Sequence, residues 1–419
     1  MEESNPVIKN VDVGVKDELI TFNTNNQTAV RTIDGTGKVL IPGMYNCHAH
    51  SPMTLLRGFA NDTALEDWLF NHIFPAEQKI KGIPNAVYTG ATLAIAEMIA
   101  SGTIAFNEMY FGLPLVAKAV EEAGVRANLC NAVLSFEPDN YDYTKSSEYE
   151  ETAEILNTYH KAAHGRIKAN ASLHCAYTTH PAAWQQVTEF AKKHEINMQV
   201  HISESLAEHN KSIEMFGMTP VEAFSKYGVF DVPTVAAHAC WVTEDDIQKL
   251  AHHNVTVAHN PVYNLKLASG TAPIDDMQKK GINITLGTDG VASNNSHDLF
   301  EEIKLASILQ KRMKDDPTAV PALSAIKMAT VNGAKAFGNK LGGIIKEGYE
   351  ADLVMLDFNN PRQIPCYDPL VNLAYSTTGR DVVMTLCQGK ILYEHGEFKT
   401  IDIEKVMHEA KGIGEKICP

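Results

Sequence analysis

The stretch Ile41-Pro42-Gly43-Met44-Tyr45-Asn46-Cys47-His48-Ala49-His50 has the pattern of a β-strand that ends in two histidines. Side chains two residues apart on a strand point to the same side, so His48 and His50 can hold one metal ion from a single rigid element. By itself a His-x-His pair is a weak signal, because a structural histidine pair gives the same pattern. The rest of the chain decides between these two interpretations.

Length and composition indicate a globular protein. The chain has 419 residues, 44% of them hydrophobic and 21% charged, which suits a large α/β barrel with a small appendage. The net charge of -15 argues against a nucleic-acid or anionic-membrane partner. No apolar run is long enough for a membrane span, and residues 1–5 lack a signal-peptide layout. Seven cysteines, with no Cys-x-x-Cys pair, predict free thiols in a reducing cytoplasm.

Short apolar runs alternate with amphipathic segments from about residue 40 to 340. Eight runs have the character of strands: 39–42, 103–106, 127–133, 167–173, 197–202, 234–237, 255–258 and 283–286. Helical patterns fill the gaps, for example 86–100, 114–123, 182–194, 244–252, 274–280 and 299–312. Strands that alternate with helices indicate a parallel sheet, and eight such units predict a closed (β/α)8 TIM barrel over residues 43–340.

Both flanks of the predicted barrel have a different pattern. Residues 1–42 and 341–400 carry short β-type runs separated by turn residues: 7–8, 19–22, 29–33, 342–345, 351–356, 382–387 and 390–393. We expect the two flanks to pair into one small β-sandwich beside the barrel. Residues 401–419 are expected to form a C-terminal helix, over 401–416, and a tail.

In barrels of this class, active sites lie at the C-terminal ends of the strands. Six of the eight predicted strands carry a histidine or an aspartate there: His48 and His50, then His174, His201, His238, His259 and Asp289. One such histidine is usually structural, but chance would not place so many of only 17 so regularly. The Asn-Pro that follows His259 suggests a structural turn.

Three imidazoles and one carboxylate, with one position left open, suit a catalytic divalent metal site. The predicted ligands of one metal ion per chain are His48, His50, His201 and Asp289, with Zn²⁺ favoured and Fe²⁺ as the alternative. A metal ion held in this way lowers the pKa of its bound water.

Longer motifs surround these residues. They read Pro42-Gly43-x-x-Asn46-Cys47-His48-Ala49-His50, His201-x-x-Glu204, His259-Asn260-Pro261-x-x-Asn264-Leu265-Lys266-Leu267-Ala268-Ser269-Gly270 and Gly287-Thr288-Asp289-Gly290-x-Ala292-Ser293-Asn294-Asn295. From about Gly35 to Gly396 the chain resembles the metal-dependent amidohydrolase superfamily, and within it the 5'-methylthioadenosine/S-adenosylhomocysteine deaminase family. The resemblance implies hydrolytic conversion of the 6-amino group of an adenosine-type nucleoside to the inosine-type product plus ammonia. The implied substrates are 5'-methylthioadenosine, 5'-deoxyadenosine, adenosine and S-adenosylhomocysteine.

The resemblance also implies catalytic roles for three residues. Glu204 resembles the acid/base that protonates the purine ring at N1. Asp289 would take a proton from the attacking water and pass it to the departing ammonia. His238 would orient that water and stabilise the developing oxyanion. Addition of hydroxide to an amino-bearing ring carbon requires such proton carriers within hydrogen-bond reach. For Glu204, the alternative is a solvated loop carboxylate.

Three further residues resemble substrate contacts of the family. Glu77 follows an insertion after strand one and would accept hydrogen bonds from the ribose hydroxyls. The alternative for Glu77 is a charge at a helix start, which the helix dipole favours. His174 resembles a substrate contact, and Trp68 would line the pocket.

The chain departs from the family pattern at two places. An arginine shortly after strand three can pair there with the substrate carboxylate, but residues 127–148 contain only Lys145, and Arg126 begins that strand at its far end. This absence favours 5'-substituents that are neutral over S-adenosylhomocysteine. The N-terminal flank is also short and polar, which predicts a less complete sandwich.

Two other functions compete with a nucleoside deaminase. The same metal site would serve a deaminase or chlorohydrolase of a free aminopurine, pyrimidine or triazine ring, in which Glu77 would have no ribose to hold. The second competing function is that of a metal-free, non-catalytic barrel used for assembly, and the intact set of metal ligands argues against it. Another zinc-deaminase fold is excluded because its His-x-Glu and Pro-Cys-x-x-Cys pattern is absent. The sequence leaves open whether the protein forms a homo-oligomer.

Overall fold

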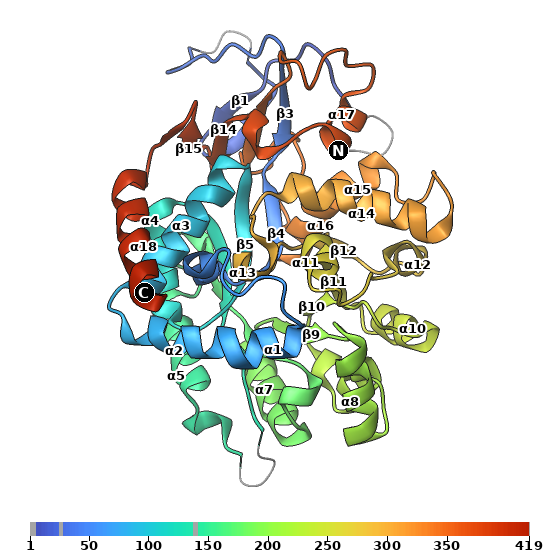
Figure 1. Ribbon diagram of the computed structural model, residues 1–419. Coiled ribbons are helices and arrows are strands. Elements are labelled where there is room, and N and C mark those ends of the chain that lie inside the picture. The colour runs from blue at the N-terminus through green and yellow to red at the C-terminus, as the bar shows by residue number, and fades with distance from the viewer. Residues whose placement is uncertain (1–5, 25–27, 137–140, 419) are drawn as a thin grey trace.

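A ring of parallel strands surrounded by helices forms the centre of the computed structural model, which describes residues 6–24, 28–136 and 141–418 (Figure 1). The strands are β4 (Met44–Ala49), β5 (Thr103–Met109), β6 (Arg126–Cys130), β7 (Ile167–Ala169), β8 (Ala171–Leu173), β9 (Met198–Ile202), β10 (Thr234–His238), β11 (Thr256–His259) and β12 (Ile284–Leu286). They form two parallel sheets, β4 to β7 and β8 to β12. The predicted (β/α)8 barrel is confirmed.

The predicted fourth barrel strand is divided into β7 and β8. β7 pairs with β6, and β8 pairs with β9, so the strand changes partner at Asn170. Single parallel bridges join the two sheets, from Val133 to Leu173 on one side and from Ala49 to Asp289 on the other. The ring therefore closes through two seams.

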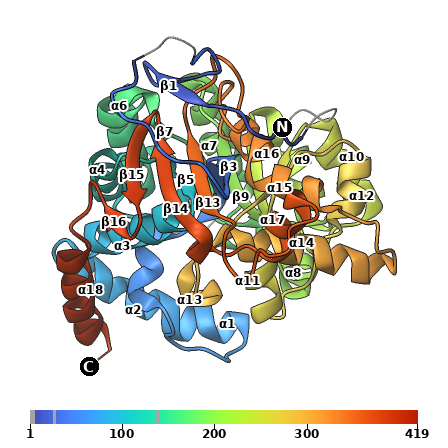
Figure 2. The ribbon, with the colours of Figure 1, turned by 90° about the horizontal axis from the view of Figure 1, so that it is seen from above.

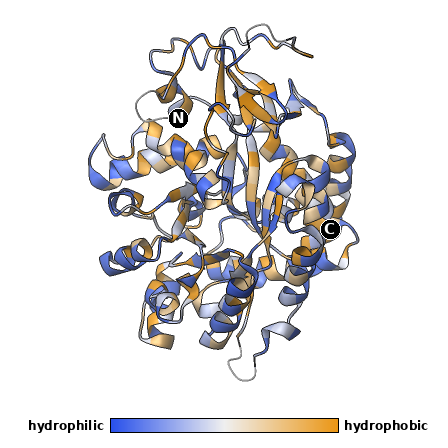
Figure 3. Ribbon diagram, turned by 180° about the vertical axis from the view of Figure 1, so that it is seen from behind, coloured by the Kyte–Doolittle hydropathy of each residue, from blue (hydrophilic) through white to orange (hydrophobic). Residues whose placement is uncertain are grey.

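The helices around the barrel agree with the sequence prediction to within two residues at each end. They include α3 (Ala86–Ala100), α4 (Leu113–Ala123), α7 (Pro181–His194), α10 (Glu244–His252), α12 (Ile274–Lys279) and α14 (Leu299–Lys314). α4 has Pro114 in its first turn, where the missing backbone donor costs nothing, and ends at Gly124 with φ 91°. Figure 3 shows hydrophobic residues concentrated on the strands.

The C-terminal helix predicted from the sequence is present as α18 (Ile403–Ile417). It packs on α3, which therefore lies between the barrel and a second helix. This position explains why α3 is apolar on nearly all sides, with only a few of its side chains reaching solvent. Among the described residues, no helix is both long enough and apolar enough to cross a membrane.

An antiparallel sheet beside the barrel contains strands from both flanks of the chain. Its order is β16 (Glu397–Phe398), β15 (Lys390–Glu394), β14 (Val382–Cys387), β13 (Leu353–Asp357) and β3 (Lys38–Pro42) (Figure 2). The prediction that 39–42 is the first barrel strand is wrong, because β3 pairs with β13 and the barrel begins with β4. Gly43 separates the two strands. A Cβ there would lie 2.4 Å from Ile104, so the close approach to β5 requires glycine.

A two-stranded hairpin, β1 (Gly14–Lys16) and β2 (Leu19–Thr21), covers one face of this sheet. Its Ile20 is buried against Leu353, Met384 and Leu386. The predicted association of the two flanks is therefore present, but it is less complete than a full sandwich. The runs 7–8, 29–33 and 342–345 form no strand, so those three predictions are wrong. Ile8, Val30 and Ile33 in these runs are exposed, while Ile345 packs, partly buried, against the core of the small sheet without pairing as a strand.

Arg126 joins the barrel to the small sheet. It is the first residue of β6, and its Nε donates to Asp352 Oδ2 over 3.0 Å while Nη2 donates to Glu350 Oε2 over 2.7 Å. The side chain of Asp352 is 1% exposed and also accepts the Gln388 amide. Arg126 therefore lies at the start of its strand, as expected, and the histidines lie at the opposite ends of theirs.

Candidate active site

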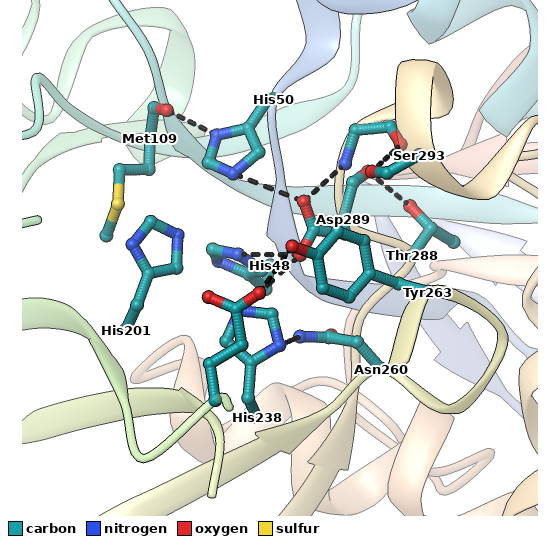
Figure 4. A network of polar contacts seen from close by, with 12 residues as sticks. His48, His50, Met109, His201, His238, Asn260, Tyr263, Thr288, Asp289 and Ser293 are labelled. Atoms are coloured by element: carbon teal, nitrogen blue, oxygen red, sulfur yellow. Dashed lines mark hydrogen bonds and ion pairs between the residues drawn. The ribbon is translucent and has the colours of Figure 1, made fainter. Parts of the chain in front are cut away.

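Four imidazoles and one carboxylate converge at the C-terminal ends of the barrel strands (Figure 4). His48 lies in β4, His50 just after it, His201 in β9 and His238 at the end of β10, with Asp289 beyond β12. Nε2 of His48 lies 3.4 Å from Asp289 Oδ2, and Nε2 of His50 lies 3.3 Å from Asp289 Oδ1. The rings of His48 and His201 are 4.8 Å apart. The structure thus brings the four predicted ligands together.

The backbone at the end of β12 places Asp289 against the first strand. The N–H of Asp289 donates to the carbonyl of His48 over 2.9 Å, and Asp289 has φ 62°, an unusual conformation for an aspartate. Gly287 allows this approach, because a Cβ there would lie 2.7 Å from the His48 Cβ. Strained backbone of this kind is concentrated at functional sites in proteins.

The orientation of two histidines is fixed by carbonyl partners. Nδ1 of His50 lies 2.5 Å from the carbonyl oxygen of Met109, and Nδ1 of His201 lies 2.8 Å from that of His174. A carbonyl only accepts, so each Nδ1 carries the proton and each Nε2 offers a lone pair to the cluster. Nε2 of His48 is buried and has no hydrogen-bond partner among the described residues. Three such nitrogens and the Asp289 carboxylate are a donor set that fits a zinc ion.

His238 differs from the other three histidines. Its Nδ1 accepts hydrogen bonds from the side-chain amides of Asn260 and Asn264, each over 3.2 Å. The proton is therefore on Nε2, which lies 3.6 Å from Asp289 Oδ2 and 3.8 Å from Glu204 Oε2. His238 is close enough to form a second ligand group with His48 and Asp289, but it presents an N–H rather than a lone pair. This separates it from the ligand set.

Glu204 faces the cluster instead of solvent. Its side chain is 17% exposed, Oε1 accepts the hydroxyl of Tyr263, and burial raises the pKa of Glu204 to about 8 against the opposing effect of that hydrogen bond. The backbone N–H groups of Ser203 and Glu204 donate to the buried carboxylate of Glu208. These contacts argue against a solvated loop carboxylate.

Two of the three predicted substrate contacts, Glu77 and His174, lie close to the proposed metal ligands. Glu77 is half-buried on α2 (Phe74–Gly82), where burial raises its pKa to about 7 and the nearby Tyr110 and His50 oppose that shift. The ring of His174 lies 4.9 Å from that of His201, and burial lowers the His174 pKa to about 4, so the ring is neutral. Trp68 is buried in the hydrophobic core of this segment.

Three residues that support the site were not predicted from the sequence. Tyr263, Asn260 and Asn264 all lie in the motif that begins at His259, to which no chemical role was given. His259 itself is buried, and among the described residues it belongs to neither group of possible metal ligands. Asn260, Tyr263 and Asn264 could have been predicted from their position, because they directly follow a strand whose C-terminal end faces the same side of the barrel as the ligands.

Comparison with known proteins defines the class. Residues 39–392 match the model of the amidohydrolase family, so the chain belongs to that family. It is 42% identical to a 5-methylthioadenosine/S-adenosylhomocysteine deaminase from Acetivibrio thermocellus, over 99% of this chain and 96% of that one. It is 40% identical to a 5'-deoxyadenosine deaminase from Methanosarcina acetivorans, over 98% and 94% of the two chains. Within the amidohydrolases, the chain therefore belongs to the 5'-methylthioadenosine/S-adenosylhomocysteine deaminase family.

A solved structure agrees with this assignment. An adenosine deaminase from Xanthomonas campestris with bound zinc superimposes with a TM-score of 0.89 and 31% identity, over 97% of this chain and 93% of that one. The shared architecture includes nearly the whole barrel and the flanking sheet.

Proposed function

We propose that this protein is a metal-dependent hydrolytic deaminase that acts on the 6-amino group of adenosine-type nucleosides and releases ammonia. The observation that carries the proposal is the convergence of His48, His50, His201 and Asp289 beside a proton carrier, Glu204, and a hydrogen-bond donor, His238. The names of the relatives and the zinc in the Xanthomonas structure support the same reaction class.

His48, His50, His201 and Asp289 are proposed to hold one divalent metal ion, with zinc favoured. The bound ion would supply the Lewis acidity that makes hydroxide available near neutral pH. His238 is left out of this set because its Nε2 carries a proton. That N–H instead faces Asp289 and Glu204, where it would stabilise negative charge on the attacking oxygen.

Proton transfer is assigned to two carboxylates. Glu204, with its pKa raised to about 8, is protonated near neutral pH and can deliver a proton to N1 of the purine ring. Asp289 takes the proton of the attacking water and passes it to the departing ammonia. The pKa values of the two carboxyl groups are shifted in opposite directions, as an acid and a base require. Burial alone would raise the pKa of Asp289, but His48 and His50 hold it well below its ordinary value.

Ribose recognition is assigned to Glu77. Its half-buried carboxylate lies on the segment that follows β4, close to His50, and it can accept two hydroxyl groups. His174 would contact the substrate as a neutral ring, and Trp68 would support the pocket from the core. A free base has no ribose, so Glu77 distinguishes a nucleoside deaminase from the free-base alternative.

The 5'-substituent is proposed to be neutral. Residues 127–148 contain no arginine, and Arg126 is bound to Asp352 and Glu350 at the other end of its strand. The side chain of Lys145 is 81% exposed and paired with Asp142. On the same loop, Phe136 is 63% exposed. Burial of the S-adenosylhomocysteine carboxylate without a cation partner would be costly.

The test is ammonia release from adenosine, 5'-deoxyadenosine, 5'-methylthioadenosine, S-adenosylhomocysteine, guanine and cytosine under identical conditions. We expect the highest kcat/KM for a neutral 5'-substituted adenosine. Turnover restricted to guanine or cytosine would replace this proposal with the free-base alternative. The cell compartment is proposed to be a reducing cytoplasm, because all seven cysteines are free thiols.

A further inference from the structure

Tyr263 contacts both Glu204, the proposed acid/base, and His238, the proposed hydrogen-bond donor to the attacking oxygen. It lies in the first turn of α11 (Pro261–Lys266), its side chain is buried, and its hydroxyl donates a hydrogen bond to Oε1 of Glu204. Its ring centroid lies 5.1 Å from that of His238. We propose that Tyr263 is a positioning residue for the deamination, which holds Oε1 of Glu204 and leaves Oε2 as the oxygen that exchanges a proton with the substrate. This inference rests on the proposed role of Glu204.

The two carboxylate oxygens of Glu204 have different surroundings. Oε1 is bonded to the phenol, while Oε2 lies 3.8 Å from Nε2 of His238, beside the ligand cluster. A carboxylate that rotates about its last bond can present either oxygen. A hydrogen bond from a rigid, buried donor removes that freedom and fixes which oxygen meets the substrate. Burial and the charges of Glu204 and Asp289 keep the phenol protonated, so it remains a donor.

The main chain of Glu204 is held by a separate residue. Glu208 accepts the N–H groups of Ser203 and Glu204 over 3.2 and 2.6 Å, and these bonds do not involve Tyr263. Loss of the phenol hydroxyl should therefore release the carboxylate without moving the loop. The next residue on α11, Asn264, donates to Nδ1 of His238. One short helix thus supplies hydrogen bonds to both Glu204 and His238.

Tyr263→Phe tests the assignment, because it keeps the ring against His238 and removes only the hydroxyl. We expect kcat to fall by about 10- to 100-fold, because the variant lacks one hydrogen bond to the carboxylate that Glu204 becomes as it delivers its proton. KM and metal content should stay close to the parent values, because neither ribose nor ligand contacts change. The matched control is Tyr375→Phe, which removes a hydroxyl bonded to Ser307 outside the site and should keep the parent kcat.

A double-mutant cycle with Glu204→Gln distinguishes the positioning role of Tyr263 from the proton-transfer role of Glu204. If Tyr263 acts through Glu204, Tyr263→Phe should cause no further loss in the Glu204→Gln background. Equal losses in both backgrounds, or a parent-like kcat for Tyr263→Phe alone, would overturn the positioning role and leave Glu204 as the proton carrier. A Glu204→Gln variant that turns over at nearly the parent rate would overturn both.

Discussion

The N–H of Asp289 donates to the carbonyl of His48 over 2.9 Å, and the side chains of the same two residues face each other over 3.4 Å. The bond joins the end of the last barrel strand to the first, so it helps to close the ring. The same contact aligns two of the proposed metal ligands. Closure of the barrel and assembly of the site therefore depend on one local arrangement.

Removal of the metal ion should abolish turnover and lower the thermal midpoint. A ligand present at about 1,000 times its Kd stabilises the native state by about 4 kcal/mol, and chelation withdraws that contribution. Elemental analysis, ammonia release and a thermal melt before and after dialysis against a chelator are the measurements. Zinc added back should restore both signals. Full activity in protein shown to lack metal would contradict the assignment.

Glu204→Gln should reduce kcat by about 10²- to 10⁴-fold, as expected for a general acid/base group. Metal content and thermal midpoint should not change, because Glu204 is not among the proposed ligands. Glu214→Gln, on the exposed face of α8 (Leu206–Phe216), is the matched control and should behave like the parent. A loss of less than a few-fold in Glu204→Gln would remove Glu204 from the mechanism.

Glu77→Ala should weaken turnover of adenosine-type nucleosides far more than turnover of any free base. Each hydrogen bond from a ribose hydroxyl to this carboxylate is worth about 1.5–3 kcal/mol, so the loss of two implies a large fall in kcat/KM. The measurement is kcat/KM for adenosine and for adenine with both proteins. An equal fall for the two substrates would assign Glu77 a structural role at the start of α2.

5'-Methylthioadenosine or 5'-deoxyadenosine should show a higher kcat/KM than S-adenosylhomocysteine. The physical reason is the desolvation of a carboxylate that meets no arginine on the loop after β6. A parent enzyme that prefers S-adenosylhomocysteine would show that another cation fills this role.

Arg126→Met should destabilise the protein by about 3–5 kcal/mol, since it leaves Asp352 and Glu350 without their cation in a largely buried position. The midpoint of denaturant unfolding measures this loss, while kcat of the folded protein should be unaffected. Arg312→Met removes an exposed ion pair with Asp315 and should change stability by less than about 1 kcal/mol. Equal effects of the two substitutions would contradict a structural role for Arg126.

The sequence was sufficient for the barrel and its proposed ligands because both are encoded locally. Apolar runs indicate strands. A histidine at the end of such a run, for example His201, can be recognised from the local sequence without knowing which strands lie beside it. The role of 39–42 could not be predicted, because two apolar strands separated only by Gly43 have the pattern of one. The division of the fourth strand at Asn170 could not be predicted either, because it depends on pairing with strands distant in the sequence: the first half pairs with β6 and the second with β9.

The contacts made by Tyr263 could not be predicted either. The tyrosine and Glu204 are 59 residues apart, and only the closed barrel brings them together. The short flank runs such as 29–33 were misinterpreted for a different reason. β-type residues were present, but no partner surface buried them, and strands of two to five residues gain little without one.

In the part of the chain that the structure describes, an isolated β-bridge joins the two sheets of the barrel on each side, and the proposed ligands come from both sheets. His48 and His50 belong to the first arc, while His201 and Asp289 belong to the second. A metal ion held by all four residues would therefore link the sheet β4 to β7 with the sheet β8 to β12. The yield of native protein in a cell would then track the supply of zinc during synthesis, before any substrate is encountered.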